Sequence, residues 1–467
     1  MGGLRQTGAR VLPAAFLLLV FLTGGATLEG DVAKAVTGAV SGVLLAGLCL
    51  FSKGWMKPGV LVPLAFAAGF VALGLAQLVP LPPELITALP GRQTAYLGLE
   101  ALGQSPERLA LSLAPEATAI SLLAVLAPLC GFALVAGLRW SRSAQALSWM
   151  IPALGVASAG LGFAQVVFTG VPELYFYDFT NTGSPTGFFS NANHQASFLL
   201  MCLPFVGVLA ADLRRDWEGG DADVARAVGV GVLGFILLFG ILAAGSAAGY
   251  LMLAPVALLS VSVALTRRQS KSRRRVPVIL IGAVLLAVAA ASVFSSPRLS
   301  GLGATDLGDG PASRAGMNRV GAGILAEHWQ AGTGLGSYSD VYSLYEDPET
   351  VSRIYIAHAH NDYLEWLVET GLAGAALLAA FLLWWLARAA GLWARAGDDA
   401  LSLRRAASAA CLVPLLHSLV DYPLRTPALL TLAAMCLALM VVPQRRAGDG
   451  APPRAAEDGE GPRGIEL

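Results

Sequence analysis

Histidine is scarce in this chain, and it stands beside asparagine or aspartate in three separate segments. The sequence has five histidines among 467 residues. An imidazole, whose unperturbed pKa is about 6.5, can accept a proton near neutral pH when an amide or a carboxylate orients it. The pattern therefore suggests acid–base chemistry carried by Asn193-His194, His358-Ala359-His360-Asn361-Asp362 and His417-Ser418-Leu419-Val420-Asp421.

His360 is the residue that we expect to act as the general base, with Asn361 or Asp362 orienting its ring. A structural alternative is that Asn361 is only the N-cap of the helix that follows. His358, His360 and Asp362 could also begin a metal site, but His-x-His in a loop is a weak signal and the sequence defines no further ligand. We therefore expect neither a metal nor a cofactor.

Two arginines precede this segment and suit an anionic ligand. Arg314 and Arg319 lie in residues 311–330, where apolar side chains recur at helical spacing. Guanidinium groups bind phosphate oxygens bidentately and stay charged in partly dry surroundings, so these arginines could hold an anionic lipid headgroup. The alternative is that both are solvated or extend toward lipid headgroups, which is the commoner fate of interfacial arginine.

The elements that must position these residues are membrane spans. Hydrophobic residues make up 55% of the chain and charged residues only 13%, whereas soluble domains have about 25% charged residues. The net charge is zero, so no basic surplus indicates nucleic-acid binding. We predict an all-α, polytopic membrane protein with about twelve transmembrane helices. Their expected ranges are 11–27, 35–52, 59–79, 118–138, 146–168, 195–211, 227–245, 249–266, 276–294, 369–388, 406–420 and 426–443.

The spans divide the chain into four regions. Residues 1–294 should hold spans one to nine, with an outer loop at about 80–117, and residues 369–443 should hold spans ten to twelve. Residues 295–368, between spans nine and ten, are expected to form a mostly helical periplasmic cap that carries the active site. Residues 444–467 are rich in proline, glycine, alanine and charge, which is typical of a disordered tail.

The distribution of basic residues predicts which side of the membrane each loop faces. With a cytoplasmic N-terminus, 23 of the 31 lysines and arginines fall on the cytoplasmic side of the predicted spans. All five histidines then fall on the outer side. We therefore expect both termini in the cytoplasm and the chemistry on the outer face.

Taken in order along this topology, several segments together resemble the O-antigen ligase and polymerase superfamily of bacterial envelope proteins. No single motif is decisive, and the resemblance covers most of the chain. The segments are Pro80-Leu81-Pro82-Pro83, Gly187-Phe188-Phe189 with Asn193-His194, Arg314 followed by Gly332-Thr333-Gly334-Leu335-Gly336, the run from His358 to Glu365 with Glu369-Thr370-Gly371-Leu372, and His417-Ser418 with Asp421-Tyr422-Pro423.

The resemblance implies a polytopic helical enzyme of the bacterial inner membrane that transfers a glycan from undecaprenyl diphosphate to an acceptor hydroxyl in the periplasm. It matches His360 to the family's catalytic histidine and Arg314 to the cap arginine that holds the diphosphate. We expect an inverting, metal-independent reaction. Substrate-binding roles are expected for Arg319, His358, Asn361, Asp362, Asn193, His194, His417 and Arg425.

One position departs from the family's pattern. The family usually has an arginine after a serine in the outer turn between spans seven and eight, where this chain has Ser246-Ala247. By this comparison Arg319, Arg353 or Arg425 would have to supply the missing charge, or the donor binds differently.

Several functions remain open at this stage. The expected partners are an undecaprenyl-diphosphate-linked glycan, the lipid bilayer and an acceptor that is lipid A core, another glycan or a protein. The chain could accordingly be a ligase, a polymerase of repeat units or a protein O-oligosaccharyltransferase. A glycolipid flippase or transporter is an alternative of another class, although the predicted spans contain almost no charged residues, which counts against ion-coupled transport.

Overall fold

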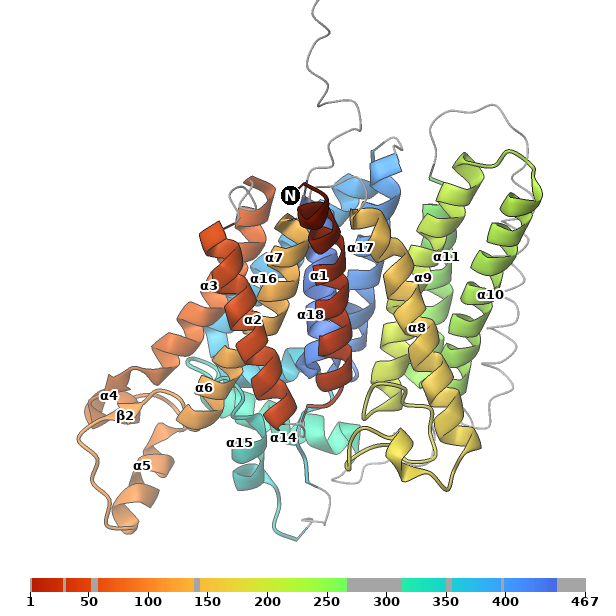
Figure 1. Cartoon of the computed structure of the whole chain (residues 1–467). Coiled ribbons are helices and arrows are strands. Elements are labelled where there is room, and N and C mark those ends of the chain that lie inside the picture. The colour runs from red at the N-terminus through yellow and green to blue at the C-terminus, as the bar shows by residue number, and fades with distance from the viewer. Residues whose placement is uncertain are drawn as a thin grey trace, which may run out of the picture.

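A computed structural model describes residues 2–27, 31–51, 58–137, 143–266, 313–349, 355–395 and 399–442. In these ranges long helices run side by side as a bundle (Figure 1). The long elements are α1 (Gly2–Thr23), α2 (Asp31–Phe51), α3 (Pro58–Leu78), α6 (Pro115–Ala124), α7 (Leu126–Gly137), α8 (Ser143–Val167), α9 (Ala192–Arg215), α10 (Asp221–Ala244), α11 (Ala247–Ala264), α16 (Asp362–Trp393), α17 (Asp399–His417) and α18 (Pro427–Val441).

Short elements gather at one end of the bundle, opposite the N-terminus, and we call this the cap end (Figure 1). Most of them belong to the predicted outer loop and to the predicted cap, and two single turns lie between other predicted spans. An antiparallel pair of two-residue strands also lies in the outer loop, which the all-α prediction missed. The elements are β1 (Pro80–Leu81), α4 (Pro83–Thr87), α5 (Arg92–Ala101), β2 (Leu109–Ala110), α14 (Arg314–His328) and α15 (Tyr338–Tyr345), with single 3-10 turns at η1 (Pro172–Leu174) and η2 (Pro423–Arg425).

The class of an all-α membrane protein is confirmed, whereas the number of twelve spans is not. Among the described residues, eight helices are long and apolar enough to cross a membrane. The first and last predicted spans correspond to shorter apolar helices, Val11–Thr23 and Pro427–Val441. The predicted span 276–294 lies outside the described residues. The eight helices are Val32–Phe51, Pro58–Leu78, Pro115–Gly137, Ala146–Val167, Ala192–Arg215, Asp221–Ala244, Ala247–Ala264 and Asp362–Trp393.

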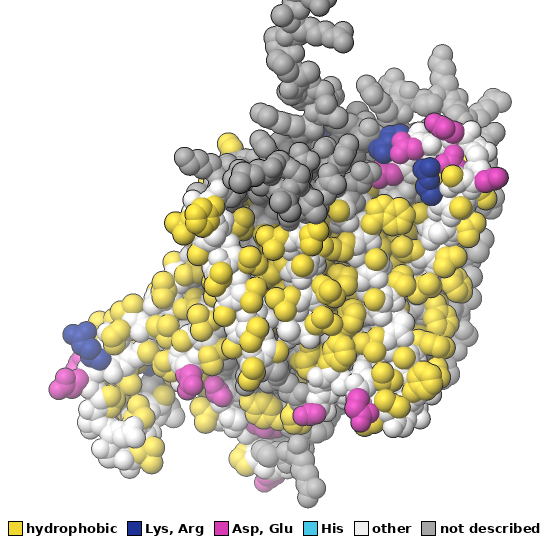
Figure 2. All heavy atoms as spheres, viewed as in Figure 1, with side chains coloured by type: hydrophobic (Ala, Val, Ile, Leu, Met, Phe, Trp, Pro, Cys, Tyr) yellow, Lys and Arg dark blue, Asp and Glu magenta, His cyan; other side chains and the backbone are white. Residues whose placement is uncertain are grey.

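The surface of the bundle agrees with burial in lipid. Figure 2 shows hydrophobic side chains across the middle of the visible face, with acidic and basic side chains toward its two ends. Exposed apolar residues such as Leu50, Phe235 and Leu383 come from different helices of the bundle. Such a surface would be a costly contact with water but is the expected contact with lipid tails.

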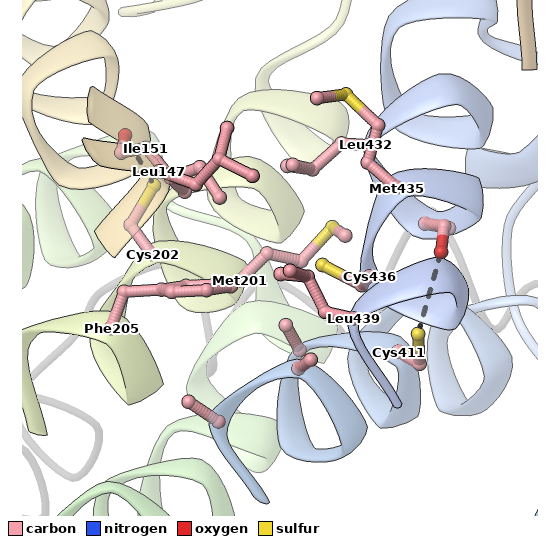
Figure 3. Close-up of a cluster of buried hydrophobic side chains, with 14 of the residues drawn as sticks. Leu147, Ile151, Met201, Cys202, Phe205, Cys411, Leu432, Met435, Cys436 and Leu439 are labelled. Atoms are coloured by element: carbon pink, nitrogen blue, oxygen red, sulfur yellow. Dashed lines mark hydrogen bonds between the residues drawn. The ribbon is translucent and has the colours of Figure 1, made fainter. Parts of the chain in front are cut away.

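The centre of the bundle is an apolar core built around α9, which packs against α8, α10, α11 and α17. Figure 3 shows Met201, Cys202 and Phe205 of α9 meeting side chains of α8, α17 and α18. Cys202, Cys411 and Cys436 are buried free thiols in this core, as the apolar runs around them predict. The interior below the cap end is therefore filled by side chains.

Arginines at the end opposite the cap satisfy the last carbonyls of helices. Arg388 and Arg404 each donate to Met440 O at 2.8 Å, near the end of α18. Arg214 donates to Ala264 O at 2.7 Å, at the end of α11. Helix C-termini leave carbonyls without intrahelical donors, and guanidinium groups satisfy them while complementing the helix dipole.

The cap is attached to α16 by backbone hydrogen bonds. Thr333 N donates to Val368 O and Gly334 N donates to Glu369 O, each at 2.9 Å. Gln77, at the end of α3, joins the same junction, since its Nε2 donates to Glu369 O at 2.8 Å and its Oε1 accepts from Leu335 N at 2.9 Å. A small apolar cluster that includes Met317, Ile324, Tyr338, Val341 and Val368 completes the contact.

Gly371 interrupts α16 where this junction lies. Its φ of 57° and ψ of −147° are non-helical. A Cβ at this position would lie 2.6 Å from Gly332 N and 2.8 Å from Gln330 O. Only glycine combines this backbone conformation with so close an approach of another backbone segment. The break therefore separates the first turns of α16, at the cap end, from its membrane-spanning part.

We predict that Gly371→Ala lowers the free energy of unfolding by at least about 2 kcal/mol, because the new Cβ forces both backbone strain and displacement of the 330–332 segment. The check is the thermal unfolding midpoint in one detergent. Gly391→Ala is the matched control: it lies in the same helix, no atom lies within 4 Å of its added Cβ, and it should be neutral or slightly stabilising. Equal midpoints for both variants would contradict the proposed role of Gly371.

Candidate functional site

The three histidine segments meet around one buried carboxylate, Asp421, whose side chain is 0% exposed. Asn193 Nδ2 donates to its Oδ2 at 2.7 Å, and Tyr422 N donates to its Oδ1 at 2.9 Å. His360 Nδ1 lies 3.4 Å from Oδ1, and Arg314 Nη2 lies 3.8 Å from Oδ2. We call these residues, together with His194 and His417, the Asp421 cluster.

His194 and His417 form the buried side of the cluster. The Nε2 atom of each ring lies 3.9 Å from an oxygen of Asp421, and the side chains are 2% and 1% exposed. On the other side of each ring, Nδ1 contacts a hydroxyl: Thr426 Oγ1 at 3.0 Å for His194 and Ser197 Oγ for His417. Both rings are therefore enclosed by protein, and the geometry does not favour the substrate contact predicted for them.

His360 and Arg314 form the open side of the cluster. Their side chains are 28% and 30% exposed, in contrast to the enclosed histidines. A ligand that approaches from the cap end therefore meets an imidazole and a guanidinium that share Asp421 as a neighbour. This places the two residues that the sequence analysis ranked first on the accessible face of one site.

The surroundings keep Asp421 ionised. Burial by itself would raise its pKa, but the neighbouring His360, His194 and His417 side chains lower the pKa well below its usual range. A carboxylate without a proton only accepts hydrogen bonds, so it can orient the N–H of an adjacent imidazole. Asp421 thus has the geometry and charge of an orienting group.

The backbone of His360 is strained. Its φ is 51°, and it is the single non-glycine residue with positive φ in the described part of the chain. Left-handed backbone at such a residue costs about 1–3 kcal/mol and persists only where the surroundings hold it. In this conformation the His360 ring lies beside Asp421, with Nδ1 3.4 Å from Oδ1.

Asn361 and Asp362 do not orient His360 as predicted. Asn361 Oδ1 caps α16 by accepting from Tyr363 N and Leu364 N, each at 3.1 Å, which was the structural alternative for this residue. Asp362 Oδ2 instead accepts from Ser418 Oγ at 2.8 Å. The carboxylate beside the His360 ring, 3.4 Å from Nδ1, is that of Asp421, a residue far away in sequence that the local pattern around His360 could not reveal.

Arg425 is held by carboxylates and is not available as the missing family arginine. Its guanidinium binds both oxygens of Glu369 at 2.9 and 3.2 Å and lies 3.4 Å from Glu365 Oε1 and 3.5 Å from Asp362 Oδ1. The three acids lie on one face of α16 and are almost fully buried. Arg425 therefore anchors α16 to η2, and the prediction that it binds substrate is not supported by its surroundings.

The other candidate replacements lie apart from the cluster or outside the description. Arg319 is exposed on α14, and a spacing of five residues puts it about 140° around the helix from Arg314. Arg353 lies outside the described residues. Ala247 is the first residue of α11, after Ser246, whose Oγ accepts from Gly249 N at 3.1 Å.

His328 is the histidine that lies away from the cluster. Its Nε2 contacts Tyr345 Oη at 2.9 Å, and its ring fills the space that a Cβ at Gly91 would occupy. Arg92, in the same region, donates to Gly332 O. Burial, and then the nearby Arg92, lower the pKa of His328 from 6.5 to about 4. His328 and Arg92 therefore belong to the contact between the outer loop and the cap.

Residues to which the sequence analysis assigned no individual role also belong to the site. Tyr422 contacts three imidazoles, with its ring centroid 4.4 Å from His358, 4.9 Å from His360 and 5.1 Å from His194. Asp421 was visible as a residue four positions after His417 at a helix end, a spacing that brings two side chains together. His358 Nδ1 also contacts Glu365 Oε1 at 2.9 Å. The spacing of these two residues in the sequence indicates this pair less clearly than it does the pair of His417 and Asp421.

Three helices begin at the cluster. The starts of α9, α14 and α16 are capped by Asn191, Ser313 and Asn361, each of which accepts from a backbone N–H of the first turn. Helix N-termini carry positive partial charge and favour anions. The helix starts therefore add to the positive potential that Arg314 supplies beside Asp421.

We predict that Arg425→Gln lowers the free energy of unfolding by about 3–5 kcal/mol, since it leaves three buried carboxylates without their cation. The measurement is the unfolding midpoint in detergent. Arg226→Gln is the control, because the Arg226 side chain is 55% exposed and its partner Asp223 still accepts from Glu218 N and Gly219 N, so its loss should change the midpoint little. Similar midpoints for the two variants would show that the buried network contributes no more than a surface pair.

A second prediction concerns pH. Unfolding returns His328 to water, where it binds a proton at its ordinary pKa, so the stability that neutral His328 contributes is present above pH 6.5 and is lost as the pH falls toward 4. Between about pH 7 and about pH 5, the unfolding midpoint of the wild type should fall further than that of His328→Gln. A fall of equal size in both proteins would contradict the assignment.

Comparison with known proteins identifies one part of the chain. Residues 232–379 match the family model described as O-Antigen ligase. A search of curated proteins found no match. The matched range contains Arg314, His358 and His360, whereas Asn193 and Asp421 lie outside it. Residues 232–379 are thus similar to the O-antigen ligase family, the family that the sequence as a whole resembles.

Proposed function

We propose that this protein transfers a glycan from undecaprenyl diphosphate to an acceptor hydroxyl at the cap end, on the periplasmic face of the bacterial inner membrane. The O-antigen ligase match suggests a membrane glycosyltransferase of the ligase or polymerase kind. The observation that carries the proposal is the open side of the Asp421 cluster, where His360 and Arg314 are the partly exposed groups. A base and a cation side by side suit a reaction that removes a proton and releases an anion.

His360 is the proposed base. Because ionised Asp421 only accepts hydrogen bonds, it favours the His360 tautomer with the proton on Nδ1, 3.4 Å away. Nε2 then keeps its lone pair and can take the proton of an acceptor hydroxyl. The role of Asp421 is to orient this ring and to stabilise the imidazolium that forms.

Arg314 is the proposed ligand of the diphosphate. The helix starts beside it favour negative charge in the same place. A diphosphate is already a good leaving group, so it needs stabilisation of its charge and not a proton. Arg314 can supply that charge without a metal, and we propose a metal-independent reaction on that ground.

The reaction proposed is a single displacement. The acceptor oxygen, losing its proton to His360 Nε2, forms a bond to the anomeric carbon of the donor. The bond between that carbon and the diphosphate oxygen breaks, and its electron pair stays on the diphosphate beside Arg314. The configuration at the anomeric carbon is inverted because one displacement occurs.

Two features support the sidedness and the enzyme class. Arginines that cap helix ends, such as Arg214, Arg388 and Arg404, lie at the end opposite the cap, which fits a cytoplasmic location of that end. The apolar core between α9, α17 and α18 fills the bundle below the cluster, and this favours an enzyme with an outer site over a flippase or transporter (Figure 3).

We predict that His360→Asn and Arg314→Lys each lower glycan transfer by about 10²–10³-fold or more while the protein still inserts and folds. Asparagine is chosen at residue 360 because it tolerates left-handed backbone. Lysine at 314 keeps one charge but loses bidentate binding of phosphate oxygens. Arg319→Lys is the matched control on the same helix and should retain transfer if Arg314 holds the diphosphate.

The assay uses the purified protein in liposomes with an undecaprenyl-diphosphate oligosaccharide. Lipid A core, a second glycan donor and a candidate protein are supplied as acceptors in separate reactions, each with and without EDTA. Release of undecaprenyl diphosphate with one acceptor identifies ligase, polymerase or protein oligosaccharyltransferase. Full activity of His360→Asn would exclude the proposed base, inhibition by EDTA would overturn metal independence, and lipid translocation without release would favour the flippase.

A further inference from the structure

We propose that Glu365 is a positioning residue that holds His360 in its left-handed conformation with its ring beside Asp421. This inference rests on the proposed function for its effect on catalysis, but the contact itself can be tested without activity. Glu365 lies on α16, one turn after the cap residue Asn361, and its side chain is 1% exposed. A buried carboxylate in this position must bind donors, and the donors that it binds precede His360.

Each oxygen of Glu365 holds one of the two residues before His360. Oε1 lies 2.9 Å from His358 Nδ1, and Oε2 accepts from Ala359 N at 2.8 Å. Ala359 is itself 0% exposed. The carboxylate therefore fixes both a side chain and a backbone amide of the segment that leads into the strained residue.

The residues after His360 are fixed as well. Asn361 caps α16, and Asp362 N donates to Ser418 O at 3.0 Å and to Asp421 O at 3.2 Å. His360 thus stands between two short segments whose positions are set by hydrogen bonds. Its φ of 51° is the conformation that joins them, so removal of either set of bonds lets the backbone relax.

The neighbouring acids on α16, Asp362 and Glu369, bind other partners than the residues before His360. Glu369, one turn further along, binds Arg425 through both oxygens. Asp362 accepts from Ser418 Oγ and from Leu424 N at 3.1 Å. Glu365 also lies 3.4 Å from Arg425 Nη1, which stabilises its charge, but among the side-chain contacts described for these three acids it alone reaches His358 and Ala359.

The experiment compares leucine at two positions that share Arg425. Glu365→Leu and Glu369→Leu both remove a buried partner of Arg425, yet Glu365→Leu alone releases residues 358–359. We expect Glu365→Leu to lower kcat by about 10²-fold or more, the effect of a misplaced catalytic group, with donor binding unchanged. Glu369→Leu should lower kcat much less.

Glu365→Gln serves as the conservative rescue. Its amide oxygen can still accept from Ala359 N, while its NH₂ group faces His358 Nδ1 in the other neutral tautomer. We therefore expect Glu365→Gln to retain kcat within about tenfold of the wild type. A loss as large as that of Glu365→Leu would overturn the positioning role. It would mean that kcat depends on the negative charge of Glu365 and not on its contacts with His358 and Ala359.

Hydrogen exchange of the peptide that contains Ala359 provides the readout that does not depend on activity. Its amide should exchange faster in Glu365→Leu than in Glu369→Leu. Equal exchange in the two variants, or an active Glu365→Leu protein, would overturn the proposal. If the wild type transfers no glycan, the proposed function fails, while the exchange comparison still decides whether Glu365 holds the segment.

Discussion

The cap end of this protein depends on one buried negative charge. A carboxylate removed from water is stable only when donors and positive charge surround it. Asp421 obtains them from Asn193 at the start of α9, from Arg314 at the start of α14 and from His360 just before α16. One charge thus fixes the relative positions of three helix starts. The base and the cation of the proposed reaction, His360 and Arg314, are positioned by their contacts with this charge.

Arginine is used differently at the two ends of the bundle. At the end opposite the cap, Arg388 and Arg404 bind backbone carbonyls and close helix termini. At the cap end, Arg425 neutralises acids of α16, and Arg314 lies partly exposed beside Asp421. A guanidinium surrounded by three carboxylates offers little to an anion, whereas one that faces a single shared carboxylate and several helix starts still can.

Much of this arrangement could be predicted from the sequence, because it follows from local periodicity. Apolar runs predicted the long helices, the spacing of Met317 and Ile324 predicted α14, and the residue pattern placed His360 and Arg314 first among the candidates. The partner of His360 could not be predicted in this way. Asp421 is brought beside it by tertiary packing, and the expected substrate contact of Arg425 is replaced by ion pairs with acids of α16 that only the fold brings to it.

The glycines where the cap meets α16, the outer loop and α6 have a consequence for how such a protein can diverge. Gly332, Gly334, Gly336 and Gly371 all have positive φ, and an added Cβ at each would meet atoms of another segment at 2.6 Å or less. Sequence change at this junction would move the cap and the acidic face of α16 together. Substitutions at these four glycines are therefore costly, whereas parts of the cap and outer loop away from them can change without moving α16.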